Sequence, residues 1–438
     1  MQEHLYGVVS LTPQHYYHHD HSSGLTREKE SEESPYWFRG KRPRLTPPND
    51  PELHLWMDQR QAMEAGRGRY KGHRRQQSPQ HYLTTVNHTH QIKASIDDMS
   101  KIPDFDDLPQ VKDMPQGCAW GVFDKDGKKD VYGTLNNITP EILKSAYSEL
   151  KDGVSVSLNW PIGAIQTPGF GRKGLVHKVV SFVDTPLASH GYDDEVEFNT
   201  QCSSQWDSLC HFHHQESQSG YNGIQTNVKA LEQHYGDEDH DQKIPTLNHW
   251  HKRGGLVARA VFIDFKKWAD EQGRKFNPFD SDKISVEDIE TIAKKQGVEF
   301  KTGDVIIIRS GFTEGLTGQS GEKQSELMGS HRTCGVTGDV ETAKWFWNKH
   351  FAAVAGDMIA FEHIPPIDPK TGKEGSVAGL VLHQYFLALF GMPIGELWDL
   401  KALSETCEKL GRYSFLLTSA PLNVYGSIGS PPNALAVF

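Results

Sequence analysis

The sequence lacks several features that would point to common classes of protein. None of its 438 residues lies in an apolar run near the ~20 residues that a membrane helix needs, so no membrane anchor is predicted. No GxxxxGK[ST] motif is present, and we find no support for a nucleotide-binding function. The five cysteines form no CxxC pair. A scattered, odd set is typical of reduced thiols and not of a disulfide framework or a zinc ribbon.

Positive charge and hydrophobic residues are also scarce. Asp and Glu number 57 against 46 Lys and Arg, which gives a net charge of -11 and argues against a nucleic-acid or anionic membrane partner. The hydrophobic fraction of 36% and the mean hydropathy of -0.59 are low for a compact enzyme, so we expect part of the chain not to fold. The first residues, Met-Gln-Glu-His, have no basic or apolar segment of a secretory signal, and we expect a cytoplasmic protein.

The composition changes once along the chain. Residues 1–95 hold ten of the 23 histidines, 13 basic and 10 acidic residues, few aliphatic residues and no sustained periodicity. Such a segment buries too little apolar surface to offset its ordering entropy, so residues 1–95 are predicted to be a disordered polar tail rich in His and Arg. Residues 96–438 have a globular composition, and we expect them to form a single catalytic domain.

Strand and helix patterns alternate through this second part, which favours an α/β fold. The expected strands are β-branched runs bounded by Gly, Asp or Pro, at 154–160, 175–183, 196–201, 256–265, 305–309, 352–355 and 413–418. The expected helices cover 140–151, 285–296, 340–350, 382–390 and 401–410, and Ser285 with Asp288 resembles a capping box.

Polar side chains gather in the segment from Gln201 to His211, QCSSQWDSLCH. Alternate positions of a strand project to the same side, so Gln201, Gln205 and Asp207 could converge on one point. His211 follows Asp207 by four residues and could join them if the chain turns. An ordinary hydrogen-bonded turn would explain these residues equally well.

A second segment, LHQYFLALFGMPIGEL, places His383 at the start of an apolar helix and Glu396 beyond the turn at Gly391. A neutral imidazole and a carboxylate are both good ligands for a divalent metal ion. The alternative is a solvent-exposed histidine and a glutamate that caps a helix, and spacing alone favours that alternative.

The chain from about Leu108 to Phe438 resembles the cyclase family of metal-dependent hydrolases, which includes bacterial kynurenine formamidase and isatin hydrolase. The family signature HxGTHxDxPxH aligns without gaps on Gln201 to His211. The phrases SSQWD, LNWP, GMPIGELWDL and SPPNALAVF are similar to the fungal branch of the family. The resemblance implies an α/β fold with a mixed sheet closing toward a barrel with flanking helices, a bound divalent metal ion and assembly as a homo-oligomer.

Carried over residue by residue, the resemblance makes Asp207, His383 and Glu396 metal ligands and His211 the general acid/base. Glutamines stand at the two signature histidines, Gln201 and Gln205. An amide oxygen is a poorer ligand for zinc than an imidazole nitrogen and suits harder ions such as Mn²⁺ better. We therefore expect one divalent ion, Zn or Mn, held by Asp207, His383 and Glu396, with Gln201 or Gln205 completing its ligands.

Three further residues are candidates for substrate contact. Asp357 and Glu362 follow a short apolar strand, where α/β folds often place functional loops, although Asp and Gly also simply make turns there. Trp206 lies inside the signature segment and could wall an aromatic pocket or belong to the core.

These expectations combine into one hypothesis: hydrolysis of a small amide, formamide, cyclic imide or lactone by metal-activated water, with His211 moving the proton. Two alternatives stay open. One is a catalytically silent member of the family that binds a metabolite or a partner, which the two glutamines suggest. The other is a lyase or cyclising enzyme of secondary metabolism that uses the metal to polarise a carbonyl.

Overall fold

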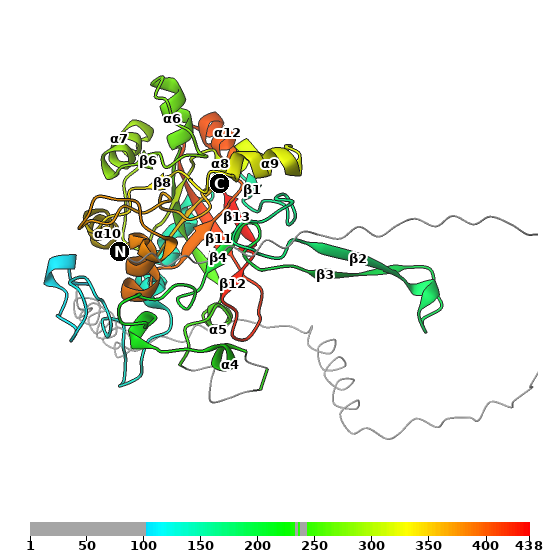
Figure 1. Ribbon diagram of the computed structural model, residues 1–438, viewed down its shortest axis with the longest axis horizontal. Helices are drawn as coiled ribbons and strands as arrows, with labels where there is room; N and C mark the ends of the chain where they lie inside the picture. Colours follow the sequence, from blue (N-terminus) through cyan, green and yellow to red (C-terminus); the bar gives the residue numbers. More distant parts are fainter. Residues whose placement is uncertain (1–101, 233–234, 237–242) are drawn as a thin grey trace, which may run out of the picture. The chain divides into compact units, whose positions relative to one another are not determined.

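The computed structural model describes residues 102–232, 235–236 and 243–438, so the predicted tail at residues 1–95 lies outside the described residues. Within the described part, nine strands form one mixed sheet in the order β1-β13-β11-β5-β7-β9-β10-β4-β12. The sheet curls into a half-barrel, and helices flank it (Figure 1). The predicted α/β fold, with a mixed sheet closing toward a barrel, is confirmed. No helix in these described ranges is both long and apolar enough to cross a membrane.

The strands of this sheet are short, and they are listed here with their bounds: β1 Ser155–Ser157, β4 Gln205–Asp207, β5 Leu256–Ile263, β7 Val305–Ile308, β9 Ala353–Gly356, β10 Ile394–Glu396, β11 Ser414–Ser419, β12 Gly429–Ser430 and β13 Ala434–Val437. Two further pairs lie outside it: β2 Val176–Ser181 with β3 Tyr192–Glu197, and β6 Lys283–Ile284 with β8 Gly335–Val336.

The α-helices are α3 Pro140–Ala146, α4 Val228–Leu231, α5 His249–Lys252, α6 Phe265–Glu271, α7 Val286–Gln296, α8 Phe312–Leu316, α9 Gly321–Met328, α10 Val340–Asn348, α11 Val381–His383 and α12 Lys401–Leu410. The chain continues from α11 directly into a π-helix, Gln384–Phe390. The capping box expected at Ser285 and Asp288 is present at the start of α7.

The centre of the sheet is parallel and buried on both faces. Strands β5, β7, β9 and β10 pair in parallel, and β7, with the sequence VIII, is fully buried. Successive side chains of a strand point to opposite faces, so Ile306 and Ile308 join one apolar cluster while Val305 and Ile307 join another. Strands covered on both faces have near-continuous hydrophobic sequences, which is why this region was readable from the sequence.

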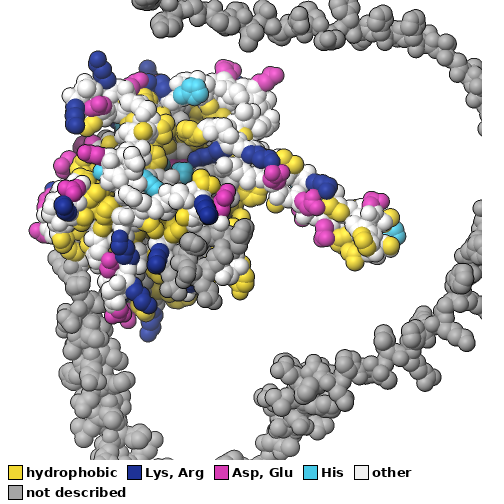
Figure 2. Space-filling model, turned by 60° about the horizontal axis from the view of Figure 1, so that its bottom comes forward, with side chains coloured by type: hydrophobic (Ala, Val, Ile, Leu, Met, Phe, Trp, Pro, Cys, Tyr) yellow, Lys and Arg dark blue, Asp and Glu magenta, His cyan; other side chains and the backbone are white. Residues whose placement is uncertain are grey.

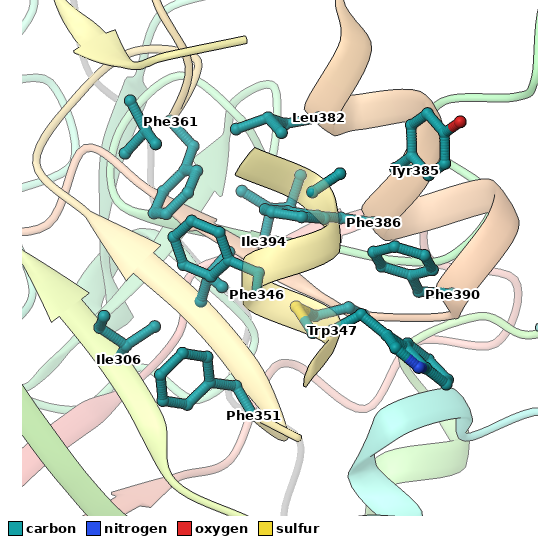
Figure 3. Close-up of a cluster of buried hydrophobic side chains, with 14 of the residues drawn as sticks. Ile306, Phe346, Trp347, Phe351, Phe361, Leu382, Tyr385, Phe386, Phe390 and Ile394 are labelled. Carbon is teal, nitrogen blue, oxygen red and sulfur yellow. The ribbon is translucent and has the colours of Figure 1, made fainter. Parts of the chain in front are cut away.

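The first cluster lies between the sheet and the helices α10 and Gln384–Phe390. Figure 3 shows rings from both helices, among them Phe346 and Phe386, packed over Ile306 and Ile394 of the sheet. The centroids of the rings of Phe346 and Phe386 are 5.2 Å apart in an edge-to-face arrangement, a favoured geometry for aromatic pairs. This packing fixes the π-helix, and the residue just before the π-helix is His383.

The hairpin β2–β3 extends away from the sheet as an arm (Figures 1 and 2). Every residue of β3 is exposed, and so are four of the six in β2. Ion pairs such as Lys178–Glu195, 3.1 Å, link its strands. The sequence analysis expected a strand over 196–201, but β3 ends at Glu197 because the chain leaves the arm there and enters the signature segment. The run GFGRKG at 169–174 matches GxGxxG, yet it leads into a strand and not into a helix, so it lacks the context of a dinucleotide-binding loop.

Candidate active site

Strands β4 and β10 bring together site residues that are distant along the chain. Gln205 and Asp207 project from the same face of β4, and β10 runs antiparallel beside it with Glu396 directly opposite Gln205. All three side chains are buried. The strand alternation expected from the sequence therefore holds for Gln205 and Asp207, and the β4–β10 pairing adds a carboxylate that is 191 residues away from Gln205 along the chain.

His383 reaches the same place from the start of the helix that crosses this face of the sheet. Its Nδ1 lies 2.9 Å from Oε1 of Glu362, and its Nε2 lies 3.3 Å from Oε1 of Glu396. Glu362 also accepts the backbone N–H groups of Val381, Leu382 and His383 at 2.7–3.0 Å. One buried carboxylate therefore caps the helix and fixes the ring of His383, so that Nε2 faces the other carboxylates.

The electrostatics of this group call for a cation. Burial favours the neutral form of His383, but the carboxylates of Glu362 and Glu396 outweigh burial and raise its pKa to about 10. Burial and the neighbouring charge of Asp207 raise the pKa of Glu396 above its usual range. The negative charges of the buried carboxylates of Asp207 and Glu396 repel each other. A proton or a metal ion bound among these groups reduces that repulsion.

The residues present fit a metal ion. Ligand atoms of Asp207, His383 and Glu396 lie within 4.8 Å of one another, and all three residues are buried. Two buried oxygens here, Gln205 Oε1 and Asp207 Oδ2, have no hydrogen-bond partner among the described residues, and Glu396 Oε1 faces Nε2 of His383 at 3.3 Å. Buried polar atoms are normally paired with hydrogen-bond partners, so these oxygens beside an imidazole nitrogen form a set of ligands suited to one divalent ion.

The amide nitrogens of both glutamines point at these carboxylates. Nε2 of Gln201 donates to Oδ1 of Asp207 at 2.5 Å, and Nε2 of Gln205 donates to Oε2 of Glu396 at 2.6 Å. Each carboxylate thus has one oxygen bound by an amide and one oxygen that no amide binds.

A tight turn after β4 brings His211 back toward Gln201. Its backbone N–H donates to the carbonyl of Ser208 at 3.0 Å, and its Nδ1 lies 3.1 Å from Nε2 of Gln201. Burial lowers the pKa of His211, and the charge of Asp207 opposes this effect only in part. The imidazole of His211 is therefore mostly neutral at pH 7, with one basic ring nitrogen.

His211 also lines a surface cavity of about 370 Å³ together with Phe212, His213 and Thr226. No Lys, Arg, Asp or Glu is present among the described residues that line it. The ring of Phe212 packs edge-on against His383 at 5.4 Å. His211 and Phe212 therefore connect this uncharged cavity to the buried group of Asp207, His383 and Glu396.

The serines of the signature segment fix the surrounding chain. Ser204 Oγ accepts the N–H of Trp160 at 2.7 Å and donates to the carbonyl of Leu397 at 2.6 Å. Ser203 Oγ donates to the carbonyl of Trp160 at 3.2 Å. These hydrogen bonds therefore hold the LNWP segment, through Trp160, and the residue that follows β10, Leu397, against the signature segment.

The other candidate residues lie further away. Trp206 points to the opposite face of β4, where it is fully buried against Trp250 and Trp398. Asp357 is buried too, and its carboxylate accepts the N–H groups of Ser310 and Gly311 at 2.6 Å. In this structure the hydrogen bonds of Asp357 go to the loop after β7.

Sequence reasoning missed Arg172. Its guanidinium donates to the carbonyl of Gln201 at 3.0 Å, and its charge contributes to the pKa shifts of His211 and Glu396. It lies in the glycine-rich run GFGRKG before the arm, whose GxGxxG spacing does not single out the arginine, so no signal in the sequence would have found it.

Burial also makes the thiols of the two cysteines in the segment unreactive. It raises the pKa of Cys210 to about 12 and that of Cys202 above its usual range. Both thiols stay protonated at neutral pH and are poor nucleophiles.

Comparisons with known proteins agree with this fold. Residues 120–363 match the model of the family described as Putative cyclase. A crystal structure titled as a novel cyclase is 26% identical, with a TM-score of 0.59, and the match covers 73% of this chain and 99% of that one. No curated protein matches the chain.

Two isatin hydrolases are more distant. Isatin hydrolase A from Ralstonia solanacearum is 15% identical over 68% of this chain and 98% of its own, with a TM-score of 0.44. The enzyme from Labrenzia aggregata is 14% identical over 69% of this chain and 98% of its own, with a TM-score of 0.42. The family match spans more than half of the sequence and includes Asp207, His211 and Glu362. The chain therefore belongs to the Putative cyclase family.

Proposed function

We propose that the protein is a metal-dependent hydrolase of a small amide, formamide, cyclic imide or lactone. The observation that carries the proposal is that one ligand atom from each of Asp207, His383 and Glu396 lies within 4.8 Å of the others, in a buried position. A divalent ion held there would supply Lewis acidity, which lowers the pKa of water and polarises a carbonyl group. Isatin hydrolases among the similar structures are consistent with this chemistry.

His211 is the residue that we assign to proton transfer. It lies at the boundary between the buried group and the cavity, and its lowered pKa leaves a neutral ring nitrogen that can accept a proton and return it to a leaving nitrogen or oxygen. The cavity holds Phe212 and no charged side chain among its described lining residues, so it suits a small, neutral and partly apolar substrate.

The test is turnover of a panel of N-formyl aromatics, cyclic imides and lactones by protein first stripped of metal and then given Mn²⁺ or Zn²⁺. We expect activity to need the metal, and His211→Ala to lower kcat by about 10²–10⁴-fold on the best substrate. His213→Ala is the matched control, because His213 lines the same cavity without contacting the buried group. Full turnover by the His211 variant would refute the assignment.

The two alternatives give different results in the same experiment. A silent binding protein would turn over nothing with either metal. A lyase or cyclising enzyme would form product without taking up oxygen from ¹⁸O-labelled water, whereas a hydrolase must incorporate it.

A further inference from the structure

The two glutamines make a pattern that the proposed function leaves unexplained. Each donates a short hydrogen bond to a carboxylate of the metal-binding group, Gln201 to Asp207 and Gln205 to Glu396, and Gln205 also makes a long contact of 3.5 Å with the same oxygen of Asp207. Both donors are amide nitrogens, because an amide oxygen at 2.5–2.6 Å from a carboxylate oxygen would place two acceptors in contact. Gln205 and Asp207 are fully buried, so no water competes for these bonds.

We propose that Gln201 and Gln205 act as positioning residues that limit the site to one metal ion. Asp207 and Glu396 have four carboxylate oxygens, and the glutamines occupy two of them, Asp207 Oδ1 and Glu396 Oε2. No amide binds the remaining two: Asp207 Oδ2 has no hydrogen-bond partner among the described residues, and Glu396 Oε1 faces Nε2 of His383 at 3.3 Å. Each carboxylate therefore offers one oxygen to an ion, and the oxygens that could bridge to a second ion are bound to N–H groups.

Electrostatics support the same conclusion. An amide N–H carries a partial positive charge and stabilises a buried carboxylate without adding a full charge. The N–H groups of the glutamines thus offset part of the negative charge of these carboxylates, which a second cation would otherwise offset. Their hydrogen bonds also restrain the rotamers of the two side chains, and the second oxygen of Glu396 faces Nε2 of His383.

The inference rests on the proposed metal site, and its test uses Mn²⁺ binding without any substrate. Metal-free protein titrated with Mn²⁺ is expected to saturate at one equivalent. Gln201→Met keeps the length of the side chain but cannot donate, so we expect it still to bind one equivalent with about 10–100-fold lower affinity.

The double variant Gln201→His/Gln205→His replaces both amides by imidazoles, which have a ring nitrogen able to bind metal. We expect it to take up a second equivalent of Mn²⁺, with an electron paramagnetic resonance signal broadened by two neighbouring ions. Gln319→His adds an imidazole at an exposed position and serves as the control, which should stay at one equivalent. Circular dichroism confirms that each variant is folded.

Three results would overturn the inference: a wild-type protein that binds no Mn²⁺ or two equivalents, an unchanged affinity in Gln201→Met, or a folded double variant that stops at one equivalent. If one equivalent binds as expected and no compound of the panel is hydrolysed, the proposed function fails while the inference stands.

Discussion

Glu362 links the packing of the helix to the chemistry of the site. It is completely buried, caps the helix that begins at Val381 and accepts a hydrogen bond from Nδ1 of His383. A carboxylate behind a metal-binding histidine fixes the ring and strengthens the ligand. Its position after a short apolar strand makes Glu362 a candidate contact of the substrate in the sequence. The structure places it behind His383.

Glu362→Gln should therefore affect the metal more than the fold. The amide cannot accept every N–H group that now points at the carboxylate, so we expect a loss of about 1–3 kcal/mol in the free energy of unfolding. Mn²⁺ affinity should fall by about 10–100-fold. Denaturant unfolding and Mn²⁺ titration measure the two effects. Glu374→Gln, which weakens only an exposed ion pair with Arg332, should change neither; equal losses in both variants would contradict this role.

At the scale of elements, one glycine sets the path from the helix to β10. Gly391 ends the π-helix with a φ of 72°, and a Cβ there would lie 2.6 Å from the ring of Tyr221 and 2.8 Å from Cα of Gly133. Five residues later the chain reaches Glu396. The close approach of the two glycines therefore sets where β10 starts, and hence where Glu396 lies.

Gly391→Ala should destabilise the protein strongly, because it combines a positive φ with a steric clash. Gly411→Ala at the end of α12 has a similar φ of 61° but nothing within 4 Å of the added Cβ. We expect about 1 kcal/mol of destabilisation for Gly411→Ala, from the backbone alone, and clearly more for Gly391→Ala. Thermal or denaturant unfolding compares the two, and equal losses would show that the contact with Tyr221 and Gly133 is not restrictive.

The arm β2–β3 is a second element with its own behaviour. Residues Val176, Val179, Tyr192 and Val196 are more than half exposed, and a two-stranded hairpin gains little stability by itself. Replacing residues 178–195 by Asn-Gly joins a cross-strand pair, His177 and Val196, through a type I′ turn.

We expect this shortened protein to melt within about 2 °C of the full-length protein, because the removed residues add no buried core. A large drop in the melting temperature would show that the arm supports the fold. The resemblance to the family also implies a homo-oligomer, which stays a prediction. Light scattering on both proteins would measure the mass and show whether the arm takes part in assembly.

For the whole molecule, metal binding should be coupled to stability. A ligand that binds only the folded state at 100 times its Kd adds about 2.7 kcal/mol. The site joins β4, β10 and α11, and unfolding separates all three. Mn²⁺ should therefore raise the melting temperature of metal-free protein, and a chelator should reverse the rise.

Asp207→Asn should lose most of this shift, because it removes a ligand charge from the buried group. Asp368→Asn, which changes an acceptor in an exposed turn, serves as the control. If Mn²⁺ raised the melting temperature of Asp207→Asn as much as that of the wild-type protein, the stabilising ion would bind somewhere else in the protein.

The sequence by itself determined the fold class and most of the central strands, because strands buried on both faces and capped helices leave local patterns such as VIII at 305–308 and the Ser285 capping box. It also indicated Asp207 through its strand position, and Asp207, His211, His383 and Glu396 together through resemblance to a family.

Only the tertiary structure decided how these residues meet. The pairing of β4 with β10, the cap of Glu362 on the helix of His383, the approach of Arg172 and the direction of the two amides all join residues distant along the chain. Strand alternation predicts that Trp206 and Asp207 point to opposite faces of the sheet. Which of the two faces carries the site depends on the elements that pack against each face. Such long-range contacts leave no local pattern in the sequence, because they depend on how the whole sheet closes.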